Sequence, residues 1–226
     1  MTLVKDLRSR RKALSSTSEP IIVWEPIPDL CTPAELDNLQ EAATYVDMIS
    51  PNGEELAEFF ASGSKTIDRK AMIASILARC GPTPRQTVVV REGADGSRVY
   101  MKDKTAHLKA YHQDASKVVD PTGGGNTFLG GLAMGLSTLV HPTAEETSES
   151  LALDARSLPF TELTMLNAVV HATISASFAI EQVGLPSIER DSGNAWNGAS
   201  YADRFHEYLQ REAAYLISQI EIEQTD

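Results

Sequence analysis

The sequence predicts an α/β protein whose sheet is mostly parallel and carries one antiparallel hairpin. Short apolar runs at 21–24, 45–49 and 86–91 have the composition of buried strands, and segments with helical periodicity separate them. Parallel neighbours need a crossover that is usually a helix, so this alternation favours helical layers around one sheet. The 226 residues, 42% of them hydrophobic, can bury the core of a single domain.

The N-terminal part of the chain is predicted to be rich in helices. Residues 2–14 form the first predicted helix, and 15–18 form a polar linker. Thr32 is expected to cap a helix that runs to Thr44, because Pro33 suits the first helical position and Glu35 has the spacing of a capping box. Two further helices are predicted at 53–60 and 67–79.

The middle and C-terminal parts follow the same alternation. The turn 93–96 joins the strand at 86–91 to a strand at 97–101, which predicts the hairpin. The remaining predicted elements are a strand-like segment ending at 117–119, a helix at 128–140, an acidic loop at 141–157, a helix at 161–182, a polar loop at 187–199 and a final amphipathic helix.

Charge and composition exclude several function classes. The net charge of −11 and the pI near 4.9 argue against nucleic acid as a main partner, because phosphate binding relies on clustered Lys and Arg. Cys31 and Cys80 lack a close partner motif and are expected to be reduced thiols. The longest apolar stretches fall short of the ~20 residues that span a bilayer, so we expect no membrane segment and a cytoplasmic location.

A glycine-rich run, Asp120-Pro121-Thr122-Gly123-Gly124-Gly125-Asn126, is the most informative stretch of the sequence. It lies between a strand-like segment and the predicted helix that starts near Phe128. Glycine permits a tight turn, and the following helix directs unpaired N–H groups and its positive dipole end into that turn. This combination predicts an anion hole of the kind that binds phosphate. Neither a P-loop nor a dinucleotide fingerprint is present, because their spacings are absent.

This run resembles the second signature of the pfkB (ribokinase-like) carbohydrate kinases, on which Asp120, Gly123 to Gly125, Gly130 and Gly131 fall. The resemblance implies the C-terminal part of a ribokinase-like three-layer α/β/α fold. It implies that 1–226 is a single partial domain without the family's N-terminal half, lid and acceptor-binding segment. The sequence segments 22–26 and 51–55 resemble those of a fungal branch of the family that is related to the maintenance-of-killer proteins.

The resemblance also implies ATP and Mg²⁺ as cofactors. Asn52 and Glu55 match the family's Asn-x-x-Glu motif, in which the two side chains organise magnesium and its waters. Magnesium prefers oxygen ligands and keeps several waters, so one carboxylate near the phosphates suffices. The same two residues also fit a helix cap followed by a first-turn glutamate, and the sequence leaves both interpretations open.

Further contacts to ATP are implied by position in the family pattern. They are Asp120, Thr122 and Gly123 to Gly125 for the anion hole, Gly93 and Gly96 for the turn near the nucleotide, and Asn167 for the adenine pocket. The glycines of the 93–96 turn are equally explained by a hairpin that needs positive φ. His171, one turn after Asn167, is expected to be a histidine at the edge of the core.

Asn126 stands where the family places its catalytic aspartate. A carboxylate can take the proton of the acceptor hydroxyl, whereas a carboxamide has no useful basicity. Asn126 can still donate or accept a hydrogen bond and cap the helix. Three functions therefore remain open: a kinase acting on an alcohol of a sugar or nucleoside-like molecule, a non-catalytic protein that binds nucleotide or a partner, and a truncated product. An exposed sheet edge predicts oligomers with like or unlike chains.

Overall fold

The computed structural model describes residues 2–14, 20–61, 68–79, 86–137, 140–153, 160–189 and 195–221. Its internal contacts divide the chain into two compact units. The first unit comprises Met1–Glu92 and Arg98–Thr105, and the second comprises Gly93–Ser97 and Ala106–Asp226. The predicted linker at 15–18 lies outside the described residues, as does Cys80. None of the helices in the described part of the chain has both the length and the apolar character needed to cross a bilayer.

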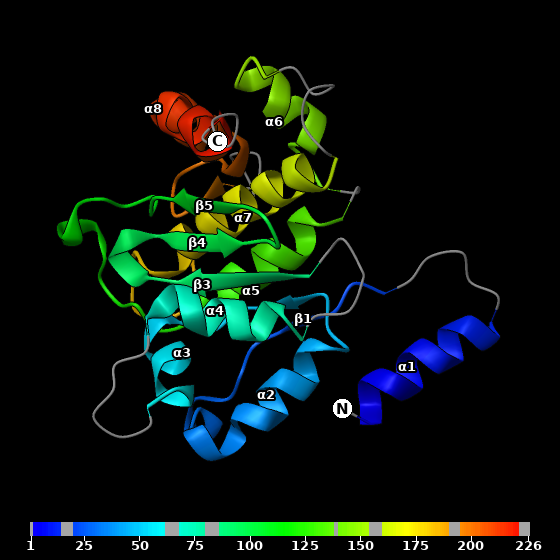
Figure 1. Ribbon diagram of the computed structural model, residues 1–226. Helices are drawn as coiled ribbons and strands as arrows, with labels where there is room; N and C mark the ends of the chain where they lie inside the picture. The colour runs from blue at the N-terminus through cyan, green and yellow to red at the C-terminus, as the bar shows by residue number, and fades with distance from the viewer. Residues whose placement is uncertain are drawn as a thin grey trace. The chain divides into compact units, whose positions relative to one another are not determined.

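A parallel sheet with helices beside it forms the first unit (Figure 1). Strand β1 (Val23–Trp24) pairs in parallel with β2 (Met48–Ile49), which pairs in parallel with β3 (Thr87–Arg91). The centre of β3 is buried on both faces, because Val88, Val89 and Val90 are at most 1% exposed. The predicted strands are therefore confirmed, although β1 and β2 are only two residues long.

The described part of the first unit also contains four helices. They are α1 (Thr2–Ala13), α2 (Leu36–Ala43), α3 (Gly53–Phe59) and α4 (Arg69–Leu77). Helices α3 and α4 both pack on β3. Thr32 does not cap α2: a 3₁₀ turn (Pro33–Glu35) follows it, and its side chain makes no capping hydrogen bond. The helix therefore begins at Leu36, after the turn that Pro33 starts.

The predicted hairpin follows β3. Strand β4 (Ser97–Tyr100) is the hydrogen-bonded neighbour of β3, and only residues 92–96 connect the two. A connection this short joins antiparallel strands, because a parallel pair needs a crossover of a dozen or more residues. Strand β5 (Thr105–Leu108) comes next and was not predicted from the sequence.

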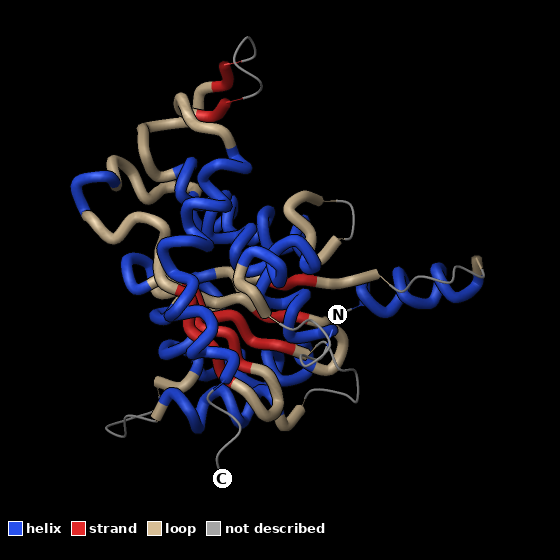
Figure 2. The backbone as a smooth tube through the Cα atoms, turned by 90° about the horizontal axis from the view of Figure 1, so that it is seen from above, coloured by secondary structure: helices blue, strands red, loops and turns tan. Residues whose placement is uncertain are grey.

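Helices dominate the second unit. They are α5 (Gly124–Gly135), α6 (Ala144–Ser150), α7 (Phe160–Ala179) and α8 (Tyr201–Glu221). Helices α5 and α7 approach closely: a Cβ atom added at Gly131 would lie 2.6 Å from the carbonyl oxygen of His171. The last helix buries the side chains of Phe205 and Tyr208 completely. Two short strands, β6 (Ile188–Glu189) and β7 (Ala195–Trp196), form an antiparallel pair (Figure 2).

Four sequence predictions in this unit are wrong. Residues 115–117 form a 3₁₀ turn, and no strand follows them, because the amides of Val119 and Asp120 both bind the carbonyl oxygen of Ile180. The predicted acidic loop contains α6, which Thr143 and Glu146 start with a capping box. The predicted polar loop contains β6 and β7. Helix α5 begins four residues earlier than predicted and ends at Gly135.

Candidate functional site

The glycine turn, defined here as residues 120–125, is anchored to the end of α7. The amides of Val119 and Asp120 donate to the carbonyl oxygen of Ile180 at 2.8 and 3.2 Å. The Asp120 carboxylate then accepts a hydrogen bond from the Thr122 amide at 2.9 Å. Hydrogen bonding from the Thr122 side chain, and then from this amide, lowers the pKa of Asp120 below its ordinary value, because both favour the charged form. Asp120 thus shapes the turn as an ionised side chain.

Helix α5 begins in a conformation that suits anion binding. Its N-cap, Gly123, has φ of +83°, and no side chain caps the helix. The Gly124 amide donates to Pro121, whereas the amides of Gly125 and Asn126 have no partner within the described residues. Unpaired amides at the positive end of a helix dipole favour a bound anion. The predicted anion hole therefore has the required donors.

Asn126 is the third residue of α5 and is exposed. It does not cap the helix, although an asparagine can do so, because Gly123 occupies the N-cap position. The helix starts earlier than its apolar run suggests, since the glycines themselves adopt helical geometry. The Asn126 side chain stands in the first helical turn, beside the unpaired amides.

Asn52 and Glu55 form a capping box at the start of α3 in the first unit. The Asn52 side-chain oxygen accepts from the Glu55 amide at 2.8 Å, and Glu55 Oε2 accepts from the Asn52 amide at 2.7 Å. Arg91, the last residue of β3, lies 3.3 Å from the same Oε2 atom. The cap interpretation is thus present in the structure, and any metal contact must use atoms that the cap leaves available.

Gly93 and Gly96 adopt φ of +58° and +89° in the turn between β3 and β4. A Cβ atom at Gly96 would lie 2.6 Å from the Ala110 nitrogen, so a side chain does not fit there. At Gly93, by contrast, no atom lies within 4 Å of an added Cβ. The positive φ of both residues, and the close contacts at Gly96, account for these glycines without a ligand, and their contact with a nucleotide stays a prediction.

Asn167 and His171 lie on the buried side of α7. Asn167 is 2% exposed, and its side-chain oxygen accepts a hydrogen bond from the Thr147 hydroxyl at 2.7 Å. His171 is 1% exposed and bonds to the Tyr201 hydroxyl and the Pro142 carbonyl oxygen. His171 is therefore a core histidine. Asn167 holds α6 against α7 in this structure, and its predicted contact with adenine stays a prediction.

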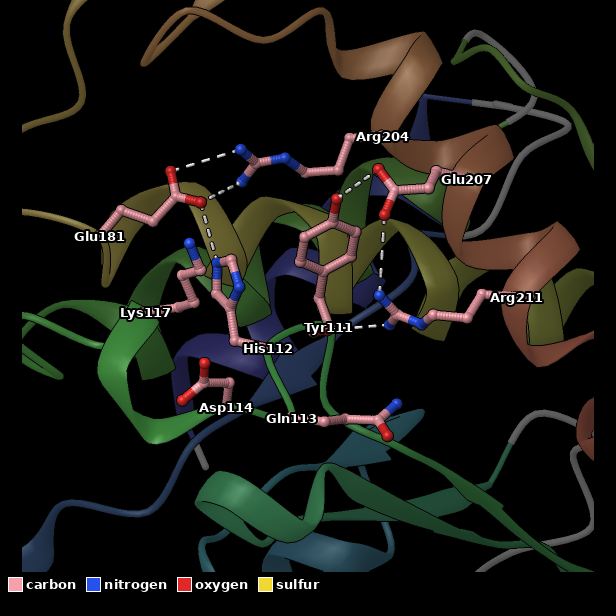
Figure 3. Close-up of a pocket in the computed structure, with 9 residues that line it drawn as sticks. All are labelled: Tyr111, His112, Gln113, Asp114, Lys117, Glu181, Arg204, Glu207 and Arg211. Carbon is pink, nitrogen blue, oxygen red and sulfur yellow. Dashed lines mark hydrogen bonds and ion pairs between the residues drawn. The ribbon is translucent and has the colours of Figure 1, made fainter.

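A pocket of about 530 Å³ in the second unit was not predicted from the sequence (Figure 3). Its walls come from the segment that follows β5, from Glu181 just after α7 and from α8. The lining residues are Tyr111, His112, Gln113, Asp114, Lys117, Glu181, Arg204, Glu207 and Arg211. They are far apart in the sequence and match no motif. The only feature of the sequence that points to this pocket is the alternation of charged and aromatic residues on α8. Solvent-exposed helix faces show the same alternation, so it does not identify a pocket.

Glu181 is the centre of the pocket's charge network. Its carboxylate pairs with Arg204 at 2.9 Å and with His112 at 2.9 Å (Figure 3). Burial lowers the pKa of His112 below its ordinary value and outweighs the opposing effect of Glu181, so His112 is neutral near pH 7. On the other wall, the Tyr111 hydroxyl donates to Glu207 at 2.9 Å. The pairs of Glu181 with Arg204 and of Tyr111 with Glu207 join side chains across the pocket walls, and Arg204 Nε stays buried without a hydrogen-bond partner within the described residues.

The structure groups the sequence-predicted site residues into two sets. The glycine turn, Asn126, Gly93, Gly96 and Asn167 belong to the second unit, and Asn52 and Glu55 belong to the first. Within the second unit, Ile180 links the glycine turn to Glu181 of the pocket. Among the described residues, no three histidine, cysteine, aspartate or glutamate side chains converge closely enough to bind a metal ion.

Comparisons with known proteins agree with the predicted resemblance. Residues 25–185 match the family described as pfkB family carbohydrate kinase. The chain is 32% identical over 222 residues to protein MAK32 of Saccharomyces cerevisiae, covering 93% of this chain and 54% of that protein. This match confirms the predicted fungal branch. The chain spans about half the length of the curated relatives it matches.

Solved structures share the fold. Ribokinase from Giardia lamblia has a TM-score of 0.58 at 18% identity, over 92% of this chain and 55% of that chain. An Escherichia coli protein described as a ribokinase II, in complex with ATP and Mg²⁺, has a TM-score of 0.51 at 20% identity, over 92% of this chain and 53% of that chain. The chain therefore has a ribokinase-like α/β fold.

Proposed function

The chain belongs to the pfkB family of carbohydrate kinases, and from this premise we propose that it is a kinase domain that binds Mg-ATP at the glycine turn. In this proposal, the γ-phosphate of ATP is transferred to an alcohol group of a sugar or nucleoside-like small molecule. The proposal draws on the family match over residues 25–185 and on the geometry of the turn.

One observation carries the proposal. The amides of Gly125 and Asn126 stand at the start of α5 without partners in the described part of the chain, next to a glycine N-cap that has no side chain. Phosphate oxygens can accept hydrogen bonds from such amides, and the helix dipole favours their negative charge. A side chain at the N-cap would compete for these donors, which explains the value of glycine there.

Magnesium is assigned to Asn52 and Glu55 through water. The family resemblance suggests this role, and the E. coli structure with ATP and Mg²⁺ supports the choice of cofactors for a protein of this fold. The residues fit an indirect role, because the capping box occupies Glu55 Oε2 and the Asn52 oxygen. Asn52 and Glu55 would orient the waters of a bound magnesium ion.

Catalysis is expected to be slow, because Asn126 stands at the position of the family's base. A carboxamide cannot accept the proton of the acceptor hydroxyl, and loss of a general base typically costs ~10²–10⁴ in rate. Positioning and charge stabilisation still contribute much of phosphoryl transfer. The second candidate function, a nucleotide-binding protein without turnover, rests on this same residue.

Calorimetric titration with Mg-ATP tests the proposal, with Gly123→Asp and Gly123→Asn as a matched pair. An added Cβ at Gly123 meets no atom within 4 Å, but its φ of +83° strains any side chain. Asp and Asn are among the residues enriched at positive φ, and the two variants carry the same backbone strain. The two variants thus differ mainly in one negative charge at the anion hole. We expect the wild type to bind Mg-ATP and the Asn variant to bind it more weakly, because its side chain competes for the amides of Gly125 and Asn126. The Asp variant should lose binding, because it also adds a negative charge.

The outcomes separate the alternatives. Binding by the Asp variant as tight as binding by the wild type would show that phosphate does not contact this turn. No binding by a folded wild-type chain would contradict the proposed nucleotide site. Binding without turnover on a panel of sugars and nucleosides would favour the non-catalytic function. The predicted association through an exposed sheet edge stays a prediction, as does the cytoplasmic location.

A further inference from the structure

Helix α8 contributes a buried charge to the second unit although it lies beyond the residues that match the family. The match ends at residue 185, and α8 spans Tyr201–Glu221. Arg204, in its first turn, has a side chain only 8% exposed. Burying a guanidinium is costly unless it is paired and hydrogen-bonded, so its partners identify what the helix is built to hold.

Arg204 clamps the C-terminal end of α7. One guanidinium nitrogen donates to Ser177 Oγ at 3.0 Å and lies 2.9 Å from a Glu181 oxygen. The other lies 3.4 Å from the second Glu181 oxygen, so the pair is bidentate. The guanidinium also lies 3.7 Å from the centre of the Phe178 ring. Bidentate charged hydrogen bonds fix orientation as well as energy.

Asn197 holds the same end of α7 from the residues just before α8. Its side-chain nitrogen donates to the Phe178 carbonyl oxygen and to Glu181, each at 2.9 Å. Asn197 adopts φ of +51°, a region in which asparagine is enriched and bulky residues are disfavoured. The segment 197–204 therefore grips Glu181 and the last turn of α7 through two independent side chains.

Glu181 directly follows Ile180, the residue that holds the glycine turn. Ile180, which precedes Glu181, accepts the amides of Val119 and Asp120 through its carbonyl oxygen. A Cβ atom at Gly124 would also lie 2.8 Å from Ile180 Cγ2, so the start of α5 rests against that side chain. A shift of the chain at 180–181 would therefore move both the entrance to the glycine turn and the first residue of α5.

We propose that Arg204 and Asn197 are positioning residues for the anion hole, acting through Glu181 and Ile180 on the glycine turn. Neither residue need contact a ligand. The inference rests on the proposed nucleotide function for its effect on affinity, whereas its effect on the turn itself is independent of any ligand.

The test compares Arg204→Met and Asn197→Gly with Arg211→Met. Glycine accepts positive φ, so Asn197→Gly removes the side-chain bonds and keeps the backbone conformation. Arg211→Met removes the same charge from the same helix, but Arg211 contacts Tyr111, Tyr208, Glu207 and Glu212 rather than Glu181. Two quantities are measured: amide hydrogen exchange over 119–127 without nucleotide, and the Kd for Mg-ATP.

We expect Arg204→Met and Asn197→Gly to speed exchange over 119–127 and to weaken Mg-ATP binding on the order of tenfold, because small displacements of a binding group have large effects. Arg211→Met should change neither quantity beyond about twofold. Arg204→Lys, which keeps one charged contact, should recover part of the affinity and serves if the methionine variant does not fold.

Two results would overturn the inference. Variants that lower the melting temperature but leave exchange over 119–127 and ATP affinity at wild-type values would show that the clamp only stabilises the fold. Equal effects in Arg211→Met would show a general loss of charge. If the wild type binds no ATP, the nucleotide function fails, and the exchange measurement still decides whether the clamp positions the turn.

Discussion

Arg91 lies 3.3 Å from Oε2 of Glu55, the oxygen that also accepts the Asn52 amide. The same guanidinium nitrogen lies 2.5 Å from a Glu25 oxygen and 3.1 Å from the Ser50 carbonyl oxygen. Glu25 follows β1 and Ser50 follows β2, so the last residue of β3 ties together the carboxyl ends of three parallel strands. That edge is where ligands bind in open α/β sheets.

Replacing Arg91 should therefore destabilise the protein markedly. Arg91→Met leaves the carboxylates of Glu25 and Glu55 without their shared cation, and we expect a loss of roughly 3 kcal/mol in the free energy of unfolding. Urea denaturation measures it. Arg98→Met is the matched control, because Glu92 keeps its second partner, Arg69; it should cost below about 1 kcal/mol. If Arg91→Met and Arg98→Met lost similar unfolding free energy, Arg91 would not have the stabilising role proposed for it.

The pair Gly130 and Gly131 should respond in opposite directions to alanine. A Cβ atom at Gly131 would lie 2.5 Å from Ser175 Oγ on α7, whereas nothing lies within 4 Å of one at Gly130. Gly131→Ala should lower the free energy of unfolding by about 2 kcal/mol, because the helices must move apart. Gly130→Ala should raise it by up to about 1 kcal/mol, since alanine favours a helix. Thermal denaturation of the two variants, compared with the wild type, measures both changes. A lower free energy of unfolding in Gly130→Ala would contradict the prediction.

Stability should fall as the pH drops below the ordinary pKa of histidine because His171 is buried as a neutral ring. Burial lowers its pKa below 6.5, and the hydrogen bond to Pro142 only partly opposes this. The unfolded chain takes up the proton first as the pH falls, so the contribution to stability is complete above that value. It is lost below 6.5, until the folded state is also protonated.

Denaturation at about pH 7.5 and about pH 5.5 measures this effect. His171→Gln should reduce the difference in unfolding free energy between the two conditions. His206→Gln is the control, because His206 is exposed and bonds only within its own helix. Burial also lowers the pKa of His112, which therefore contributes to the pH dependence of both proteins. The unfolding free energy of the wild type should still change more steeply with pH than that of His171→Gln. If the unfolding free energies of the wild type and of His171→Gln depended on pH in the same way, His171 would be excluded as a source of the pH dependence.

Asn126→Asp should raise phosphoryl transfer in the full-length protein by about 10² or more, because the carboxylate can act as the missing base. The change should not destabilise the fold, since a negative charge in the first turn of α5 favours the helix by about 0.3–1 kcal/mol. Asn126→Ala should bind Mg-ATP nearly as well as the wild type. Steady-state assays with ATP and candidate acceptors test the rate, and an unchanged rate in the aspartate variant would count against the base argument.

Elements with strong local signals could be predicted from the sequence. Val88 to Val90 form an uninterrupted apolar run, and the structure buries them as a central strand. Gly123 to Gly125 identified the helix start with unpaired amides, although α5 begins within the glycines. The spacing of Thr143 and Glu146 is that of a capping box, but the acidic composition around it favoured a loop, so the short helix was not predicted.

Features that depend on distant contacts could not be predicted. The pocket joins residues near Tyr111 to Glu181 and Arg204, and no spacing rule connects those segments. Strand β5 has the pattern Thr-Ala-His-Leu, in which only Leu108 is buried, so its alternation is weak. The role of Ile180 as an anchor depends on a backbone carbonyl, which leaves no trace in side-chain chemistry.

The chain crosses the boundary between its two units three times, because Gly93–Ser97 belongs to the second unit and Arg98–Thr105 returns to the first. Neither unit therefore corresponds to one continuous stretch of gene. A cut anywhere within 93–105 removes a strand or a turn from one unit. A fragment that is meant to isolate either unit must therefore join segments that are separate in the chain. Insertions and reporter fusions have better prospects at positions outside this shared stretch.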